Sequence, residues 1–599
     1  MNVLPSLTPL APRSLAFSGK SRQTTQPHTG PMDAPAPGES NSGRLRSKKA
    51  QAKEYQTVLG VLDRYAQQLL ATINQGKPLN AGQILYIKAP STYLPLLKAL
   101  ATVAYKEYDS GRVVVEKQET QLERLKKKLG LSGLTQHPKA VDEWAKTANA
   151  AHLALGTQQA NYAASGLSAQ QIKRLKRRLK PSINAATRKA LALNPHEVLY
   201  TALNLQPGQP LLINGHREYL PQIKALIETA AQSGTQQVDV VIEESREWDL
   251  GIPMIQHASE DVLRTGAPCL TELFKEQVEN NFGRLSLTGG DPYKFKGLDS
   301  KRITLAQSSY AKARKPFKEI FVNQHWCMYY APTKAFAKAA GYKSLREAGL
   351  DAALINRQGH LAEHLQSLAL RKERLNELIR QGYTTLTYVS VDPSTSQPDG
   401  KTNLTVGLTP RSHFVAANMV STTGHEFVPN VPTEEVFTTP DWRTVQGHAT
   451  ASLPLVMSGQ YIPAGFKVHF ENGIVTSLEG TETEPLLQKM QNTTDMDKLG
   501  EVAIVADSPI GKRGKVFNTT LLDENAASHV ALGSAYLDTL LDLSDDPNTR
   551  QQQLTEWGVN DSASHIDFMI GSPQVQVYFS KPDGKDPVLL VDNDQFLLD

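Results

Sequence analysis

Hydrophobic and polar positions divide the chain into two long stretches with different patterns. From about residue 51 to residue 395, short apolar runs such as Ile84–Ile87 alternate with segments whose apolar residues recur at helical spacing. This order is typical of an α/β domain, with a parallel sheet and flanking helices. After about residue 396, short alternating strands such as Leu404–Leu408 dominate. The C-terminal part is therefore predicted to be a β-rich α+β domain.

The first stretch contains an internal repeat. The segment Leu79–Ile87, with a Gly-Gln turn at Gly82, precedes a helical segment and the strand-like run Val113–Glu116. The segment Leu205–Ile213 carries the same features in the same order, and its turn glycine, Gly208, lies 126 residues after Gly82. Each copy predicts a strand, a packed helix and a second, parallel strand. Neither turn has the spaced glycines of a dinucleotide-binding loop, so the sequence does not predict nucleotide binding.

One hairpin in the C-terminal part is specified by its turn. The alternating run Phe466–Phe470 leads into Asn472-Gly473, and Ile474–Thr476 follows. Asn-Gly suits the two positive φ angles of a tight two-residue turn, so the sequence predicts a β-hairpin here.

These patterns predict four consecutive segments. Residues 1–50 are rich in Pro, Ser, Thr and Gly and form an expected disordered tail; residues 51–188 form an extra basic α/β module that holds the first, degenerate copy of the repeat. Residues 189–395 form the N-terminal α/β domain, and residues 396–599 the β-rich domain. The tail has no acidic residue before Asp33, so a targeting segment stays open as an alternative to a plain tail.

Composition excludes several classes of protein. No apolar run reaches the roughly 20 residues that a membrane helix needs, so we expect no membrane span. The two cysteines, Cys269 and Cys327, are too few for a disulfide scaffold, a zinc finger or an iron–sulfur protein. Scarce cysteine and the absence of a secretory signal favour the cytoplasm.

Charge is distributed unevenly along the chain. Residues 1–190 hold 29 Lys and Arg against 11 Asp and Glu, a net charge of +18, and the remaining residues carry a net charge of −14. The basic segment Gln171–Lys180 reads as a helix that ends at Pro181. It is either a phosphate-binding stripe or a solvated helix face, and the lack of nearby aromatic or glycine-rich partners favours the solvated face. The segment Gln121–Leu129 has the same two interpretations, and the solvated helix face is again favoured.

Side chains of the types that can bind metal ions are concentrated in the C-terminal part. Glu501 begins an apolar strand, His529 precedes an apolar run, and Glu434-Glu435 precede Val436. His565 and Asp567 lie two positions apart, so on a strand both point to one face. Such mixed nitrogen and oxygen donors suit Zn²⁺, Co²⁺ or Mn²⁺. Each feature alone is weak, and the residue pattern by itself indicates only a candidate metal site.

Taken together, the motifs resemble a known family. From about residue 190 to Phe568, their order is similar to that of the metal-dependent aminopeptidases of the thermophilic type, peptidase family M29. The motifs that carry the resemblance are Leu205–Gln209, Asn403–Leu408, Pro432–Thr438, Leu499–Ala503, Asp507–Ile510, Asp523–Ala526, His529–Gly533 and His565–Gly571.

The resemblance implies an enzyme that removes N-terminal residues from peptides with two divalent ions, namely Zn, Co, Mn or Mg. Its metal ligands would be Glu435, Glu501, His529, His565 and Asp567. Glu435 is chosen over Glu434 because the family pattern fixes the glutamate directly before Val436-Phe437-Thr438. Tyr536 falls where the family places a tyrosine beside the metals, and Glu501 or Glu435 would transfer the proton. The resemblance also implies a homodimer.

The basic N-terminal segment of the chain suggests an alternative hypothesis. In it, residues 1–190 attach a non-catalytic M29-like scaffold to nucleic acid or another acidic surface. The presence of all five ligand types at their motif positions argues against an inactive scaffold. Nucleic-acid contact then remains as a side role of residues 1–190, and the extra repeat copy is interpreted as a degenerate duplication used for packing or contacts.

Overall fold

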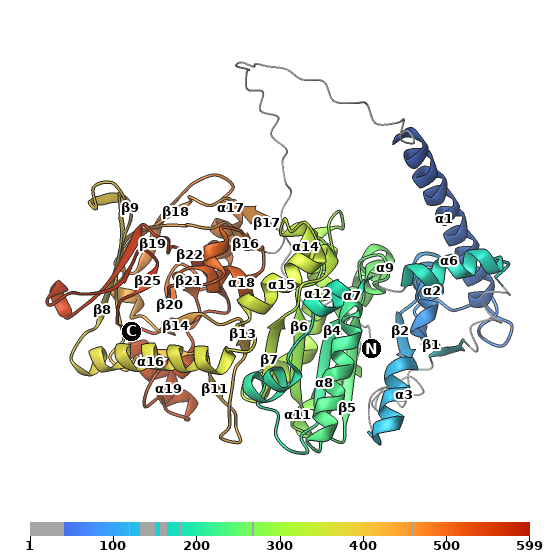
Figure 1. Cartoon of the computed structure of the whole chain (residues 1–599), viewed down its shortest axis with the longest axis horizontal. Helices are drawn as coiled ribbons and strands as arrows, with labels where there is room; N and C mark the ends of the chain where they lie inside the picture. The colour runs from blue at the N-terminus through green and yellow to red at the C-terminus, as the bar shows by residue number, and fades with distance from the viewer. Residues whose placement is uncertain are drawn as a thin grey trace, which may run out of the picture.

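The computed structural model describes residues 41–118, 120–131, 150–155, 165–179, 183–265, 269–457 and 460–598. Three parts follow one another along the longest axis of the molecule (Figure 1). They are the extra α/β module, called the added module below, then a middle unit with a parallel sheet and helices, and then a β-rich C-terminal unit. Most of the predicted tail lies outside the described residues. Helix α1 (Asn41–Leu70) begins within the last ten residues of the range predicted as the tail. None of the described helices has the length and hydropathy to cross a membrane.

The added module is a small α/β unit around a three-stranded parallel sheet of order β2-β1-β3. Helix α1 packs against it through Val58, Leu62, Ala66 and Leu70, which recur every four residues and are buried. The further elements are β1 (Ile84–Pro90), α2 (Leu94–Glu107), β2 (Arg112–Gln118), α3 (Thr120–Leu129), β3 (Ala151–Ala154), α6 (Ala169–Leu179) and α7 (Ala185–Ala190).

The middle unit has a five-stranded parallel sheet of order β13-β7-β6-β4-β5, which confirms the predicted parallel α/β architecture. Its strands are β4 (Leu211–His216), β5 (Val238–Glu243), β6 (Gly283–Thr288), β7 (Trp326–Tyr330) and β13 (Asn430–Val431). Its helices are α8 (Leu220–Gln232), α9 (Gly251–His257), α10 (Glu260–Thr265), α11 (Cys269–Glu279), α12 (Ser300–Arg314), α13 (Lys318–Val322), α14 (Lys334–Ala339) and α15 (Leu345–Ile355).

The structure confirms the internal repeat. The strand order β2-β1-β3 of the module recurs as β5-β4-β6 in the middle unit. Both turn glycines, Gly82 and Gly208, have positive φ angles, of 71° and 76°. In each turn the glutamine that follows accepts a backbone N–H from three residues earlier, from Asn80 to Gln83 Oε1 at 3.2 Å and from Gln206 to Gln209 Oε1 at 3.0 Å. The two copies therefore share the same turn as well as the same topology.

The two copies pack into one continuous structure. Leu97 of α2 belongs to the same buried cluster as Ile252 and Ile255 of α9. The Lys98 ammonium donates a hydrogen bond to the backbone carbonyl of Glu247 at 2.7 Å. Leu122 of α3 is buried in the core of the middle unit. The module is thus fixed to the middle unit by apolar burial as well as by polar contacts.

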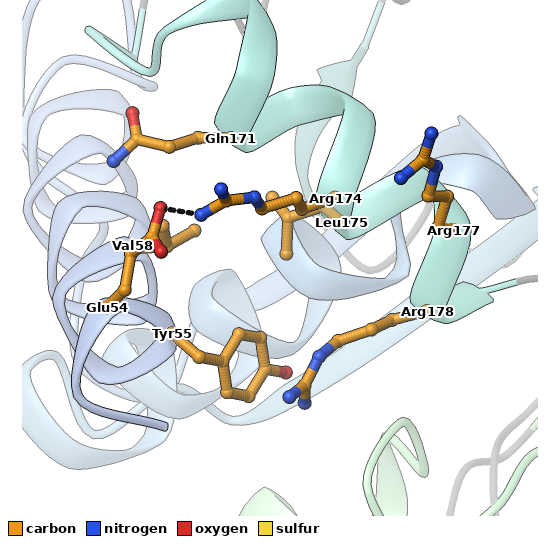
Figure 2. Close-up of a pocket in the computed structure, with 8 residues that line it drawn as sticks. All are labelled: Glu54, Tyr55, Val58, Gln171, Arg174, Leu175, Arg177 and Arg178. Carbon is orange, nitrogen blue, oxygen red and sulfur yellow. Dashed lines mark ion pairs between the residues drawn. The ribbon is translucent and has the colours of Figure 1, made fainter. Parts of the chain in front are cut away.

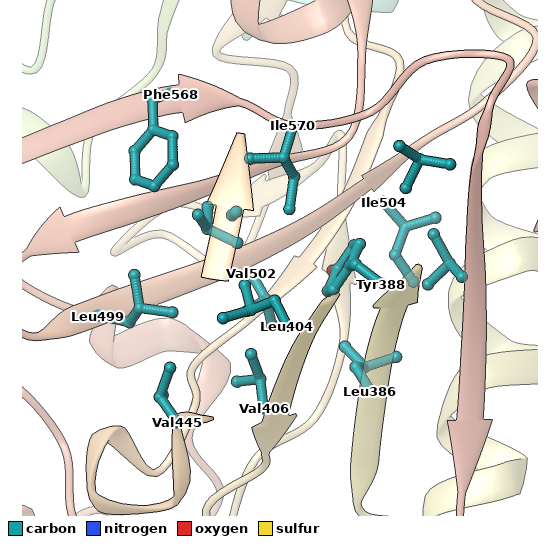
Figure 3. Close-up of a cluster of buried hydrophobic side chains, with 14 of the residues drawn as sticks. Leu386, Tyr388, Leu404, Val406, Val445, Leu499, Val502, Ile504, Phe568 and Ile570 are labelled. Atoms are coloured by element: carbon teal, nitrogen blue, oxygen red, sulfur yellow. The ribbon is translucent and has the colours of Figure 1, made fainter. Parts of the chain in front are cut away.

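The C-terminal unit is built from two antiparallel sheets, one of order β19-β18-β15-β9-β8-β23-β24-β25 and one of order β10-β14-β20-β21-β22. Apolar side chains of both sheets fill the space between them (Figure 3). The strands of the larger sheet are β8 (Thr385–Val391), β9 (Pro398–Gly407), β15 (Gln446–Thr450), β18 (Lys467–Glu471), β19 (Ile474–Glu479), β23 (Val575–Ser580), β24 (Val588–Asp592) and β25 (Gln595–Phe596).

The smaller sheet and the helices of this unit complete the fold. The strands of the smaller sheet are β10 (Val415–Ala416), β14 (Glu435–Thr438), β20 (Leu499–Val505), β21 (His529–Gly533) and β22 (His565–Met569). The helices are α16 (Leu361–Arg380), α17 (Glu484–Asn492), α18 (Thr520–Asp523) and α19 (Pro547–Glu556). Two short strand pairs are β11 (Met419–Val420) with β12 (Glu426–Phe427), and β16 (Leu455–Met457) with β17 (Gln460–Ile462).

Residue 395, the predicted division, lies between two paired strands. That position falls inside the hairpin of β8 and β9, whose strands are antiparallel neighbours. Leu368 and Leu375 of α16 already pack in the core of the C-terminal unit, so the change of core comes before the change of pattern. In the other direction, β13 returns to the middle sheet beside β7. The hydrophobic pattern of a segment indicates the type of strand it forms. It does not indicate which hydrophobic core the segment joins.

The predicted hairpin is confirmed. Strands β18 and β19 pair antiparallel across Asn472 and Gly473, whose φ angles are 51° and 83°. Both values are positive, as the tight two-residue turn requires.

Candidate active site

The five predicted ligand residues lie on four neighbouring strands of the smaller sheet. Glu435 is on β14, Glu501 on β20, His529 on β21, and His565 and Asp567 on β22. Glu501 pairs with Ala531, and Ala531 pairs with Asp567, while His529 pairs with Ala503. Because paired residues of antiparallel strands point to the same side, all five side chains lie on one face of the sheet.

The opposite face of the same strands explains why the polar side chains gather on this one. Val502, Ile504, Val530 and Phe568 alternate with the polar positions and are buried in the core between the two sheets. A bulge beside Gly500 adjusts the register directly before Glu501. A Cβ atom on Gly500 would lie 2.2 Å from the backbone oxygen of Gly533, so only glycine fits at this position.

The ligand atoms form two clusters that share one carboxylate. His529 Nε2 lies 3.2 Å from Glu435 Oε2 and 3.4 Å from Glu501 Oε1. His565 Nε2 lies 2.9 Å from Asp567 Oδ1 and 3.4 Å from Glu501 Oε2. In each cluster all ligand atoms lie within 4.8 Å of one another. The structure thus brings together all five side chains, with Glu501 between the two groups.

Both imidazole rings are oriented by the backbone. Nδ1 of His529 donates a hydrogen bond to the carbonyl of Ala527 at 3.1 Å, and Nδ1 of His565 donates to the carbonyl of Ser534 at 2.6 Å. A carbonyl only accepts, so these bonds place the proton of a neutral ring on Nδ1 and leave Nε2 free to bind a cation.

The site concentrates negative charge. Burial raises the pKa of Glu435, with His529 opposing the shift. Burial would lower the pKa of His529, but its contacts with Glu435 and Glu501 outweigh burial and raise that pKa well above its ordinary value. Burial would also lower the pKa of His565, but its contacts with Asp567 and Glu501 outweigh burial and raise that pKa well above its ordinary value. The carboxylates stabilise the protonated form of both histidines. The same negative charge favours the binding of added cations.

The residues fit divalent metal ions. Glu501 Oε2 is buried, and among the described residues its ion-pair contact with His565 Nε2 at 3.4 Å does not amount to a hydrogen bond, so the oxygen keeps an acceptor site for a bound cation. The donor set combines imidazole nitrogen with carboxylate oxygen, a mixture that suits zinc and its neighbours in the first transition series.

A sixth polar residue, Glu524, adjoins the clusters and was not assigned from the sequence. It is half-buried, and burial together with the charges of Glu435 and Asp567 raises its pKa well above the ordinary value. It lies in a short helical turn before β21, where strand periodicity gives no signal. Its position five residues before His529, inside the motif Asp523–Ala526, is the signal in the sequence that could have indicated it.

Tyr536 lies beside the clusters, where it was expected. Its ring centroid is 4.8 Å from that of His565 and 5.7 Å from that of Phe437. Burial and the charges of Glu501 and Asp567 raise the pKa of its hydroxyl, although 48% of the residue surface is exposed. The hydroxyl therefore stays protonated and can donate a hydrogen bond.

The two adjacent glutamates point to different partners. Glu434 is buried and forms a two-point ion pair with Arg357, with N–O distances of 3.0 and 2.8 Å. His364 Nε2 lies 3.5 Å from the same carboxylate. Glu435, one position later, points to His529. The choice of Glu435 over Glu434 thus agrees with the structure, in which Glu435, the first residue of β14, is the one that faces the cluster.

Most of the chain matches a family of known proteins. The family model of the thermophilic metalloprotease (M29) matches residues 196–596. The chain is 31% identical to Aminopeptidase AmpS of Bacillus subtilis, over 64% of this chain and 92% of that protein, and 30% identical to Aminopeptidase T of Thermus aquaticus, over 63% and 90%. The solved structure of wild-type AmpT from Thermus thermophilus superposes with a TM-score of 0.60 at 27% identity, covering 69% of this chain and 99% of that one.

The match covers the middle and C-terminal units and leaves the added module outside. It includes all four strands that carry the clustered carboxylates and imidazoles. The chain therefore belongs to the thermophilic metalloprotease (M29) family and is a metal-dependent aminopeptidase.

Proposed function

We propose that this enzyme hydrolyses the first peptide bond of its substrates with two divalent metal ions per subunit. The observation that carries the proposal is the pair of ligand clusters that share Glu501. One ion would be held by Glu435, Glu501 and His529, and the other by Glu501, His565 and Asp567. Zn, Co, Mn and Mg are the candidate ions, and Glu524 adjoins both clusters as a further oxygen donor.

Bound divalent ions supply two effects, a lowered pKa of a water molecule and polarisation of the substrate carbonyl. The residues of the chain perform the other steps. Glu435 or Glu501 accepts the proton of the water and returns it to the leaving amine. The Tyr536 hydroxyl donates a hydrogen bond to the oxygen that becomes negative in the transition state.

The family resemblance and the fold support further proposals about organisation. We propose that residues 189–598 are the M29 enzyme proper, that residues 51–188 are an addition packed on it, and that the enzyme is a cytoplasmic homodimer. Light scattering of the purified chain tests the dimer. A mass of one subunit at micromolar concentration would contradict it.

Hydrolysis of chromogenic aminoacyl substrates tests the function. The purified enzyme is treated with a chelator and then supplied separately with Zn²⁺, Co²⁺, Mn²⁺ or Mg²⁺. We expect chelation to abolish release of the chromophore and at least one ion to restore it. Glu501→Gln should stay inactive with every ion, and Glu363→Gln, on the exposed surface of α16, should behave as the unmodified enzyme. Activity of Glu501→Gln equal to that of Glu363→Gln would refute the proposed site.

A further inference from the structure

A second cavity lies away from the metal ligands, where the added module meets the middle unit. Its volume is about 400 Å³. Its walls come from the carboxyl ends of β4, β5 and β6 and from Arg177 and Arg178 of α6. The carboxyl edge of a parallel sheet is the usual place for ligands in α/β proteins. From this cavity we infer a second binding site, specific for a free amino acid or a short peptide.

Many of the charged groups in this cavity neutralise one another. Arg217 and Glu244 form a two-point ion pair at 2.8 and 2.5 Å. The Lys294 ammonium lies 2.6 Å from Asp249, and both side chains are about 7% exposed. His216 Nε2 lies 3.4 Å from Glu243. These pairs form a fixed framework around the cavity.

Arg178 completes this framework from the side of the added module. Its guanidinium lies 3.1 Å from Glu247 and stacks over the ring of Tyr55 at 3.7 Å. In a neighbouring pocket on the same helix, Arg174 pairs with Glu54, whereas Arg177 points away from both Glu54 and Tyr55 (Figure 2). Two arginines of the basic helix are thus engaged within the protein, which weakens its interpretation as an open nucleic-acid stripe.

Four charged groups of the cavity lie outside these close ion pairs. Among the described residues no ion pair within 4 Å engages Arg177, Lys334, Glu218 or Asp291, although Glu218 interacts at longer range with Lys334 and His216, and Asp291 with Lys294. Glu218 accepts the backbone N–H of Lys334 at 2.7 Å, and Asp291 accepts that of Tyr293 at 2.9 Å, so each keeps a further oxygen. Two positive and two negative groups match a molecule that carries both a carboxylate and an ammonium group.

The internal repeat shows that the fold does not require these charges. At the offset of 126 residues, His216, Arg217 and Glu218 correspond to Pro90, Ser91 and Thr92 of the module. The structural positions are kept, since Tyr219 corresponds to Tyr93 and both are buried. One copy thus builds the same strand and helix without the charged set. In the other copy His216 and Arg217 belong to the ion-paired framework, and Glu218 is the member of the set that no ion pair within 4 Å engages among the described residues.

The size of the cavity limits its ligand. A volume of about 400 Å³ lies near the lower end of small-molecule sites, which suits an amino acid or a short peptide. Free amino acids and shortened peptides are the products of an aminopeptidase. The cavity would therefore bind products of this enzyme at a distance from the metal ligands.

Isothermal titration calorimetry tests the inference on the full-length chain. Metal-free Glu501→Gln protein, in which the metal site is impaired, is titrated with free L-amino acids, with dipeptides, and with acetate and methylamine as probes of a single charge. We expect saturable binding of an amino acid or dipeptide and much weaker binding of acetate and methylamine. Adding Arg177→Gln or Glu218→Gln should each raise Kd about tenfold or more, because each removes a charged contact.

Lys173→Gln provides the matched control, since Lys173 is exposed on the same helix and lines neither cavity. It should leave Kd unchanged. No binding of any amino acid or dipeptide at millimolar concentration, or a Kd that Arg177→Gln and Glu218→Gln both leave unchanged, would overturn the inference. Acetate binding as tightly as the amino acids would overturn the zwitterion assignment. The rate of peptide hydrolysis by the Arg177→Gln enzyme is measured in a separate assay, and we expect it to be normal.

Discussion

Glu501 and Asp567 lie opposite the same residue, Ala531, on the two strands that flank β21. The methyl group of Ala531 is therefore the only side chain between two carboxylates on this face of the three strands. A small residue at the centre leaves the space in which ions and a water molecule can be bound. The arrangement depends on strand register, and a larger side chain at this position would close the space.

Ala531→Val adds two methyl groups between these carboxylates. We expect metal affinity and aminopeptidase activity to fall by about 100-fold or more, while the overpacked site costs about 1–3 kcal/mol of stability. Metal content by mass spectrometry and thermal unfolding by circular dichroism measure the two effects. Normal metal content in a folded Ala531→Val protein would contradict the assigned geometry.

Glu434→Gln and Glu435→Gln should have separable effects. The first breaks a buried ion pair with Arg357, so we expect it to lower the free energy of unfolding by about 2–4 kcal/mol while bound metal is retained. The second removes a ligand, so metal and activity are lost and the metal-free protein keeps its stability. Urea unfolding and metal analysis of both variants make the comparison. Equal loss of metal in both would show that the two glutamates are not divided in this way.

Tyr536→Phe removes a hydrogen-bond donor beside His565 and leaves the metal ligands in place. If the hydroxyl stabilises the oxyanion, kcat should fall by about 100-fold with little change in KM or metal content. Steady-state kinetics on one chromogenic substrate suffices. A kcat equal to that of the unmodified enzyme would remove Tyr536 from the proposed mechanism.

Asp239, on β5, makes stability depend on pH. Burial raises the pKa of this carboxyl to about 7, with Lys126 of the added module acting in the opposite direction. The folded state favours the protonated acid, so Asp239 costs stability increasingly as pH rises from about 4 to about 7. Asp239→Asn should therefore be nearly neutral near pH 4 and stabilising by about 2–4 kcal/mol at pH 8. Urea unfolding at both values checks this, and an equal effect at both would contradict it.

Local signals in the sequence predicted the elements well. The Asn472-Gly473 turn and the two Gly-Gln turns require backbone conformations that few residues adopt, so a short motif specifies them. The division predicted near residue 395 follows strand type, whereas α16 and β8 join a core formed by strands far away in sequence. Residue pattern contains no information on that choice.

The candidate site shows the same limit. His565 and Asp567 share a strand face and are visible as a pair in the sequence, whereas Glu524 adjoins the clusters from a short turn without periodicity. The second cavity was also not predicted, because it forms only where α6 of the module meets strand ends of the middle unit. Contacts between segments distant in sequence decide both features.

In the proposed site, Glu501 is shared by two metal ions. A crystal of the enzyme grown with zinc, measured on both sides of the zinc absorption edge, tests it most directly. We expect two anomalous peaks per subunit, one beside Glu435 and His529 and one beside His565 and Asp567, each in contact with Glu501. A single peak, or a second peak that does not touch Glu501, would contradict it.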